Sequence, residues 1–269
     1  MINFLVMQTK SLKEHVNRKW YWLVRWFCRT AGMILFRWRC YDMENIPKEG
    51  AFLLVSNHQS FLDPIFVGSR PKRHIGYLAR DTLFHNWFFG PLIRSLYAIP
   101  VKRQHGDLKA MRKVIDVLKE GDGICLFPEG TRTNDGRILP FKAGLGLLCR
   151  RGNAAIVPVL IDGAFDCWPR TQKIFKLGTP ITVHYGKPIS AQEIKEMGDE
   201  KLALLLQDTL RRMQNESRIA KGKEPFDYDE IDAAAQKQDN ERKESGNREK
   251  GQQGIRGKDN RESAKQQSR

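Results

Sequence analysis

The chain has 269 residues, which allows one large α/β domain or two small ones, and its 41% hydrophobic content is enough for a buried core. Its five cysteines form no Cys-x-x-Cys or Cys/His cluster, which argues against a zinc site or a disulfide framework and fits a reducing compartment. The net charge of +15 suits nucleic acid, an anionic membrane surface or a phosphorylated small molecule, and does not choose among them.

Residues 11–39 have the periodicity of an amphipathic helix. One side carries the apolar residues Leu12, Val16, Trp20, Leu23, Val24, Phe27, Ala31, Ile34 and Leu35, and the other carries Glu14, Arg18, Arg25 and Arg29. Arg and Trp beside a wide apolar stripe suit a helix that lies in a membrane interface. The alternative is a helix that packs on its own domain, and Gly32 is a position where the segment can divide. No run approaches the ~18–20 apolar residues of a spanning helix.

From residue 51 onward, short apolar runs alternate with amphipathic segments. This pattern predicts one α/β domain with a single, mostly parallel sheet flanked by helices. The expected strands are 52–55, 75–79, 99–101, 124–127, 156–161 and 181–185. The expected helices are 83–95, one capped by Asp107 and ending at Lys119, 142–151, and a long helix opened by a Ser190–Glu193 capping box.

Composition divides the chain into three predicted parts. Residues 1–40 form the membrane-docking helical segment, and residues 41–228 form the α/β domain. Residues 229–269 contain almost no apolar side chains, so they cannot offset their ordering entropy and are predicted to be disordered. Ten Lys and Arg face nine Asp and Glu in this tail, so +14 of the net charge belongs to the rest of the chain.

The segment NHQSFLD, residues 57–63, directly follows the first expected strand of the α/β domain, where such folds place their sites. A histidine is the usual general base near neutral pH, and an aspartate can hold its other ring nitrogen. His58 and Asp63 meet only if the first lies in a loop and the second in a first helical turn, as Ser60 acting as N-cap would arrange. Alternatively, Asp63 is itself the N-cap before Pro64 and has a structural role.

A second polar segment, FPEGTR at residues 127–132, also follows an expected strand. Gly130 lets the backbone approach a ligand closely, and Arg132 offers a planar fork that matches phosphate oxygens. Glu129 can orient Arg132 or accept from a substrate hydroxyl. The alternative is an ordinary turn with an exposed ion pair.

Two weaker signals complete the pattern. The strand end at residues 99–103 delivers Lys102 and Arg103, which by themselves fit a solvated basic loop equally well. The Val-Pro-Val run at 157–159 indicates by itself only an edge strand or a bulge.

In order and spacing, these four segments resemble the four motifs of the glycerolipid acyltransferases. His58 and Asp63 resemble the HxxxxD motif, and residues 127–132 look like the third motif, FPEGTRS. Residues 99–103 and 157–158 are similar to the second and fourth, which are less specific. The resemblance covers roughly residues 40–215, and size and spacing are most similar to the 1-acyl-sn-glycerol-3-phosphate acyltransferase subgroup.

The chain departs from the family pattern at three positions, which leaves the headgroup preference more open than the reaction. Thr133 stands in place of the usual Ser, Lys102 in place of an acidic residue, and Tyr97 where a Gly is common.

The resemblance implies an acyl transfer that needs no metal and no cofactor. His58 would take the proton from the 2-hydroxyl of lysophosphatidic acid, and that oxygen would attack the thioester of acyl-CoA or acyl-carrier protein to give phosphatidic acid. Asp63 would orient His58. The implied substrate-binding residues are Arg103, Glu129, Gly130, Thr131, Arg132 and Lys142, with phosphate held by the cations.

The expected partners are the lysolipid acceptor, the acyl thioester donor and anionic lipids of a membrane surface, without nucleic acid. The expected location is the cytoplasmic face of the cell membrane. One alternative is an acyltransferase for another lysolipid, such as a lyso-ornithine lipid. The other is a non-catalytic basic module that binds membranes or nucleic acid and tolerates substitution of His58.

Overall fold

The computed structural model describes residues 18–102, 107–142, 144–230 and 232–233. Contacts divide the chain into two units, residues 1–225 and 226–269. The first unit contains the sheet and the helices that cover it. In the second unit, residues 228–230 are helical. The predicted disordered tail therefore lies almost entirely outside the described residues, and the predicted domain boundaries stay predictions.

Among the described residues, seven strands form one sheet. In chain order they are β1 (Arg39–Tyr41), β2 (Phe52–Ser56), β3 (Ile75–Arg80), β4 (Ala98–Val101), β5 (Gly123–Leu126), β6 (Ala155–Asp162) and β7 (Thr182–Tyr185). Their order across the sheet is β1-β7-β6-β2-β5-β3-β4. Every neighbouring pair is parallel except β6 and β7. The predicted single, mostly parallel sheet is confirmed, and β2 lies at its centre.

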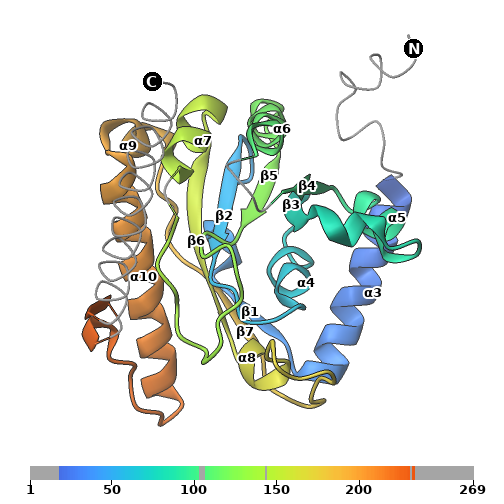
Figure 1. Ribbon diagram of the computed structural model, residues 1–269, viewed down its shortest axis with the longest axis vertical. Helices are drawn as coiled ribbons and strands as arrows, with labels where there is room; N and C mark the ends of the chain where they lie inside the picture. The colour runs from blue at the N-terminus through green and yellow to red at the C-terminus, as the bar shows by residue number, and fades with distance from the viewer. Residues whose placement is uncertain (1–17, 103–106, 143, 231, 234–269) are drawn as a thin grey trace, which may run out of the picture. The chain divides into compact units, whose positions relative to one another are not determined.

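Helices cover both faces of the sheet. They are α3 (Arg18–Phe36), α4 (Asp63–Gly68), α5 (Phe89–Arg94), α6 (Leu108–Lys119), α7 (Leu145–Gly152), α8 (Ala164–Cys167), α9 (Ala191–Glu196) and α10 (Asp199–Ala220), with the 3-10 helices η1 (Met43–Asn45) and η2 (Asp81–His85). Figure 1 shows α3 and α4 on one side of the sheet and α10 on the other.

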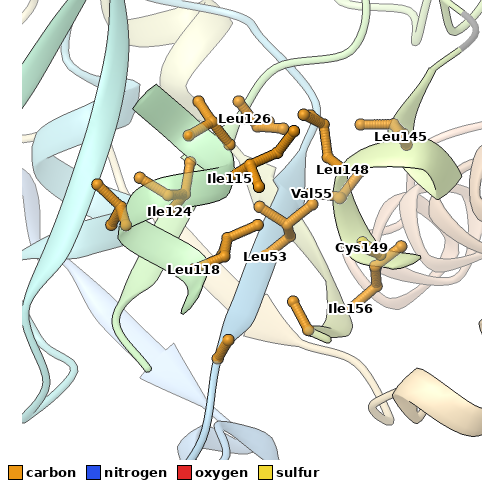
Figure 2. Packing of buried hydrophobic residues seen from close by; sticks show 14 of the residues in the cluster. Leu53, Val55, Ile115, Leu118, Ile124, Leu126, Leu145, Leu148, Cys149 and Ile156 are labelled. Carbon is orange, nitrogen blue, oxygen red and sulfur yellow. The ribbon is translucent and has the colours of Figure 1, made fainter. Parts of the chain in front are cut away.

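Alternating residues of β2 build a core on each face of the sheet, as a buried strand requires. Leu53 and Val55 belong to the cluster formed with α6, α7 and α10, part of which is shown in Figure 2. Phe52 and Leu54 belong to the opposite cluster, which includes Phe36 at the end of α3 and side chains of α4. The sheet is therefore closed off from solvent on both sides, which leaves its carboxyl edge to carry a site.

The two predicted helix caps are present. The Asp107 side chain accepts from the backbone N–H groups of Lys109 and Ala110, and Ser190 and Glu193 form a capping box. The prediction that this box opens the long helix was wrong, however. It opens α9, which ends because Met197 is extended, and the long helix α10 starts afresh at Asp199.

Other element boundaries also differ from the prediction. The helix predicted at 83–95 is interrupted between η2 and α5, because Asn86 is extended and its Oδ1 accepts from the N–H groups of Phe88 and Phe89. The helix predicted at 142–151 begins only at Leu145. The short elements β1 and α8 were not predicted, because three or four residues carry too little periodicity to register.

α3 is one continuous helix that ends at Phe36, before Arg37 adopts a positive φ of 46°. Residues 11–17 of the predicted helix lie outside the described residues. Gly32 does not divide α3. A Cβ at Gly32 would lie 2.7 Å from the Trp38 ring, so the glycine allows this close approach.

The face of α3 that packs on the domain is not its most apolar face. Tyr21, Arg25, Gly32 and Phe36 are buried, and Arg25 lies opposite the apolar stripe, as the periodicity placed it. The predicted apolar stripe points outward, and its large side chains Trp20, Leu23, Phe27, Ile34 and Leu35 are exposed. Within the part of the chain that the structure describes, no helix is both long enough and apolar enough to cross a bilayer.

The core on the α6 side predicts a simple contrast between two leucines. Leu53→Ala should lower the free energy of unfolding by roughly 2–5 kcal/mol, because it leaves a cavity in a fully buried cluster. Leu108→Ala should change it by less than about 0.5 kcal/mol, because Leu108 is 71% exposed on α6. Urea denaturation followed by circular dichroism measures both, and equal losses would contradict this packing.

Candidate active site

The candidate site lies where β2 ends, between the loops that follow β2 and β5. Asn57 fastens the end of β2 to β6, because its side-chain amide donates to the carbonyl of Ile161 and its Oδ1 accepts from the N–H of the same residue. The carboxyl ends of parallel strands meet at one edge of a sheet, so the segments 57–63 and 127–133 lie together.

His58 and Asp63 are in direct contact. Nδ1 of His58 lies 2.8 Å from Oδ2 of Asp63, and the Asp63 side chain is fully buried. The same Oδ2 accepts from the backbone N–H groups of Gln59 at 2.5 Å and Ser60 at 2.7 Å. A carboxylate oxygen such as Oδ2 can only accept hydrogen bonds, so the ring nitrogen that faces it must be the donor. Nδ1 therefore carries the proton of the neutral ring, and Nε2 has a free lone pair.

The local chain geometry follows one predicted arrangement but not its predicted cap. His58 lies in the loop and Asp63 is the first residue of α4, as the pairing requires. Neither Ser60 nor Asp63 is the N-cap, a position that Leu62 occupies without a side-chain bond. Pro64 follows in the first turn, where a missing N–H costs nothing. The Asp63 side chain accepts from the N–H groups of Gln59 and Ser60 in the preceding loop and does not cap the helix.

The His58 ring is packed from one side and open from another. It stacks on Phe127, with ring centroids 4.3 Å apart and planes at 24°. Its side chain remains 21% exposed. The ring is thus fixed in orientation by Asp63 and Phe127 and is still reachable by a substrate.

The Glu129 carboxylate binds the backbone of the His58 loop. Its Oε1 accepts the backbone N–H of His58 at 2.7 Å, and its Oε2 accepts that of Leu139 at 3.2 Å. The backbone N–H of Thr133 donates in turn to the carbonyl of His58. Burial raises the pKa of the Glu129 carboxyl to about 8, although the N–H groups of His58 and Leu139 act to lower it. Glu129 therefore braces two loops and is not presented to solvent.

Arg132 of the second segment and two cations further along the chain, Lys142 and Arg170, contact residues of the two loops. A Cβ on Gly130 would lie 2.5 Å from Nζ of Lys142, so the glycine makes room for that lysine. The guanidinium carbon of Arg132 lies 3.4 Å from the centroid of the Phe61 ring, a close cation–π stack. Thr131 accepts a hydrogen bond from Arg170 at 3.3 Å. Gly130, Thr131 and Arg132 thus follow Glu129 in the loop that binds the His58 backbone, and Lys142 lies against Gly130. Arg103 lies outside the described residues.

Among the residues with described positions, no three His, Cys, Asp or Glu side chains are arranged to hold a metal ion. The site offers a base, an orienting carboxylate and guanidinium or ammonium groups. These groups suit proton transfer from a hydroxyl beside a bound phosphate.

Comparison with known proteins agrees with this chemistry. Residues 37–162 match the family model described as Acyltransferase. Over this stretch, slightly less than half of the chain, the protein is similar to acyltransferases. The match spans β1 to β6 and so includes both segments that form the site.

Among similar acyltransferases is the 1-acyl-sn-glycerol-3-phosphate acyltransferase of Bacillus subtilis (strain 168), 28% identical over 70% of this chain and 94% of that protein. The 1-acyl-sn-glycerol-3-phosphate acyltransferase beta of Homo sapiens is 30% identical over 59% of this chain and 57% of its own length. The chain thus spans nearly all of one relative and little more than half of another.

A solved structure shares the fold. The crystal structure of the 1-acyl-sn-glycerophosphate (LPA) acyltransferase from Thermotoga maritima matches with a TM-score of 0.63. The match covers 78% of this chain and 84% of that one, and the two sequences are 24% identical. At this level of identity, the likeness shows the fold of the acyltransferase.

Three residues of the site were not singled out from the sequence. Asn57 and Phe61 lie inside the NHQSFLD segment, and their roles as a strand fastener and an arginine platform depend on partners far along the chain. Arg170 lies 39 positions after Thr131 in a region without a recognisable pattern. No local signal in the sequence marks any of the three contacts.

The buried Glu129 predicts a pH-dependent contribution to stability. The pKa of this acid rises on folding, from 4.5 to about 8, so the acid stabilises the fold fully at pH values below its pKa in the unfolded chain. This contribution is lost as the pH rises through its pKa in the folded protein. In Glu129→Gln, the fall in unfolding free energy between about pH 5 and pH 8.5 should therefore be smaller than in the wild type. Urea titrations at several pH values measure this slope.

Glu216→Gln provides the control, because Glu216 is an exposed glutamate of α10. It should keep the slope of the wild type. If Glu129→Gln also keeps that slope, Glu129 does not take up a proton on folding.

Proposed function

We propose that this acyltransferase transfers a fatty acyl chain to the 2-hydroxyl of 1-acyl-sn-glycerol-3-phosphate and so makes phosphatidic acid for phospholipid biosynthesis. The observation that carries the proposal is the contact of 2.8 Å between His58 and Asp63, in a segment whose Phe61 also contacts Arg132. The relatives in Bacillus subtilis and Homo sapiens, which are named for this reaction, support the choice of acceptor.

His58 acts as the general base in this proposal. Nε2 takes the proton of the 2-hydroxyl as its oxygen attacks the carbonyl carbon of the acyl thioester. Asp63 stabilises the imidazolium that forms, because its buried Oδ2 already faces Nδ1. When the tetrahedral intermediate collapses, the carbon–sulfur bond breaks and the imidazolium returns its proton to the leaving thiolate. No acyl-enzyme forms, and acyl-CoA or acyl-carrier protein serves as co-substrate without a resident cofactor.

Arg132 binds the acceptor's phosphate in this proposal, with Lys142 and Arg103 as further cations. The Phe61 ring stacks on the face of the Arg132 guanidinium, whose planar fork matches the oxygens of a phosphate. Gly130 and Thr131 shape the backbone around this group, and Glu129 fixes its distance from His58. Arg170, which donates to Thr131, adds a cation to the same edge.

α3 docks the enzyme on the cytoplasmic face of the membrane in this proposal. Its apolar stripe points away from the domain, with Leu23, Phe27 and Ile34 between 56% and 74% exposed. A stripe that is not used for packing fits a lipid surface better than the alternative of an internal helix. All five cysteines are free thiols, which is consistent with the reducing cytoplasmic side.

The reaction is tested with purified protein, 1-acyl-glycerol-3-phosphate and radiolabelled acyl-CoA, with acyl-carrier protein as a second donor. The wild type should form phosphatidic acid, and His58→Ala should be at least about 10²-fold slower, because the general base is lost. His184→Ala is the matched control, since the His184 ring stacks on Tyr41 at the β1 side of the sheet. It should keep wild-type turnover.

Two outcomes would contradict the proposal. Unchanged turnover in His58→Ala would remove the base, and faster acylation of a lysolipid without a bare phosphate, such as a lyso-ornithine lipid, would change the acceptor.

Membrane docking is tested by co-sedimentation with phosphatidylcholine vesicles, which carry no net charge. Phe27→Asp and Ile34→Asp should each weaken binding at least about tenfold, because each removes a large apolar side chain from the lipid contact. Ile219→Asp, at a 61% exposed position of α10, should bind as the wild type does. Equal losses in all three variants would show that α3 is not the docking surface.

A further inference from the structure

A basic pocket lies on the flank of α3, away from the motif segments. Its volume is about 190 Å³, and it is lined by α3 and by the chain that leaves α4. Six of its lining residues carry the argument: Trp22, Arg25, Trp26, Arg29, Arg70 and Lys72. Since one water molecule needs only roughly 10–15 Å³ of such space, the pocket is large enough for a phosphate group.

The deepest cation of the pocket is rigidly held. Arg25 is only 5% exposed, and its guanidinium donates to the Tyr21 hydroxyl and to the carbonyls of Pro71 and Arg73. It also lies over the Trp22 ring at 4.6 Å, and its Nε is buried without a hydrogen-bond partner. The carbonyls of Pro71 and Arg73 orient this charge, and they do not neutralise it.

Among the residues that the structure describes, the four cations of the pocket have no acidic partner. No described carboxylate forms an ion pair with Arg25, Arg29, Arg70 or Lys72. Arg70 contacts the sulfur of Met33 and the ring of Trp38 instead. The pocket therefore brings together four positive charges, one of them buried, and a bound anion would stabilise them.

The position of the pocket on the helix identifies the kind of anion. At about 100° per residue, Trp22, Trp26 and Arg29 lie between the buried face of α3 and its outward apolar stripe. If that stripe is in the acyl region of a bilayer, this flank is at the level of the headgroups, where Trp and Arg are favoured. The indole rings of Trp22 and Trp26 are 38% and 56% exposed and join the pocket to the stripe.

We propose that this pocket binds the phosphate of an anionic membrane phospholipid while the acyl chains of that lipid lie along the outward stripe of α3. The lipid is not the acceptor, because the pocket contains none of the residues around His58. The proposal rests on the membrane docking under the proposed function. It adds a preference for anionic lipid that apolar docking alone does not give.

The test measures binding of the full chain to vesicles of phosphatidylcholine alone and of phosphatidylcholine with about 30% phosphatidylglycerol, without acyl donor. Arg29→Gln with Lys72→Gln removes two exposed pocket cations and should weaken binding to the anionic vesicles roughly 25-fold, at about fivefold per charge. Binding to pure phosphatidylcholine should not change. The matched control, Arg112→Gln with Lys113→Gln, removes two exposed charges from α6, which packs on the opposite face of the sheet.

Each result decides the proposal. A preference for anionic vesicles that the pocket variant loses and the α6 variant keeps supports it. Equal loss in both variants would mean diffuse attraction, and full displacement from anionic vesicles by millimolar free coenzyme A would assign the pocket to the soluble donor. Either outcome overturns the proposal. Because no turnover is measured, a failure here is separate from a failure of the proposed reaction.

Discussion

The arrangement of the site depends on one buried oxygen, Oδ2 of Asp63. It accepts from the ring of His58 and from the backbone N–H groups of Gln59 and Ser60. A buried carboxylate would be costly without such donors, so the loop must close around it as the chain folds. The closed loop then sets both the orientation of His58 and the start of α4. One interaction therefore couples the end of the central strand to the chemistry proposed for it.

The second loop completes this arrangement from the other side. Glu129 accepts from the backbone N–H of His58, and the N–H of Thr133 donates to the carbonyl of His58. The backbone of the base therefore cannot move independently of the segment that carries Arg132. α10 supports that segment, because Gln207 accepts from the N–H of Phe141 and Gln214 donates to the carbonyl of Gly136. Contacts with β2 and α10 thus hold the two loops of the site in place.

The sequence predicted the sheet, most of its strands and the meeting of His58 with Asp63, because these depend on local periodicity and on motifs. It did not predict the bracing role of Glu129, whose two carboxylate oxygens accept from backbone N–H groups 71 and 10 positions away. It also detected the periodicity of α3 and placed Arg25 opposite the apolar stripe. It did not show that this side packs on the domain, because the carbonyls of Pro71 and Arg73 that bind Arg25 lie far along the chain.

The position of the proton on His58 shows directly whether Asp63 prepares this histidine as a base. We expect ¹⁵N NMR of protein labelled at histidine, assigned with His58→Ala, to show a neutral His58 protonated at Nδ1 and unprotonated at Nε2. In Asp63→Asn, this preference should weaken or reverse, because the carboxylate that selects it is gone. A neutral His58 that carries its proton on Nε2 in the wild type would rule out this role, since its Nε2 could not accept the proton of an attacking hydroxyl.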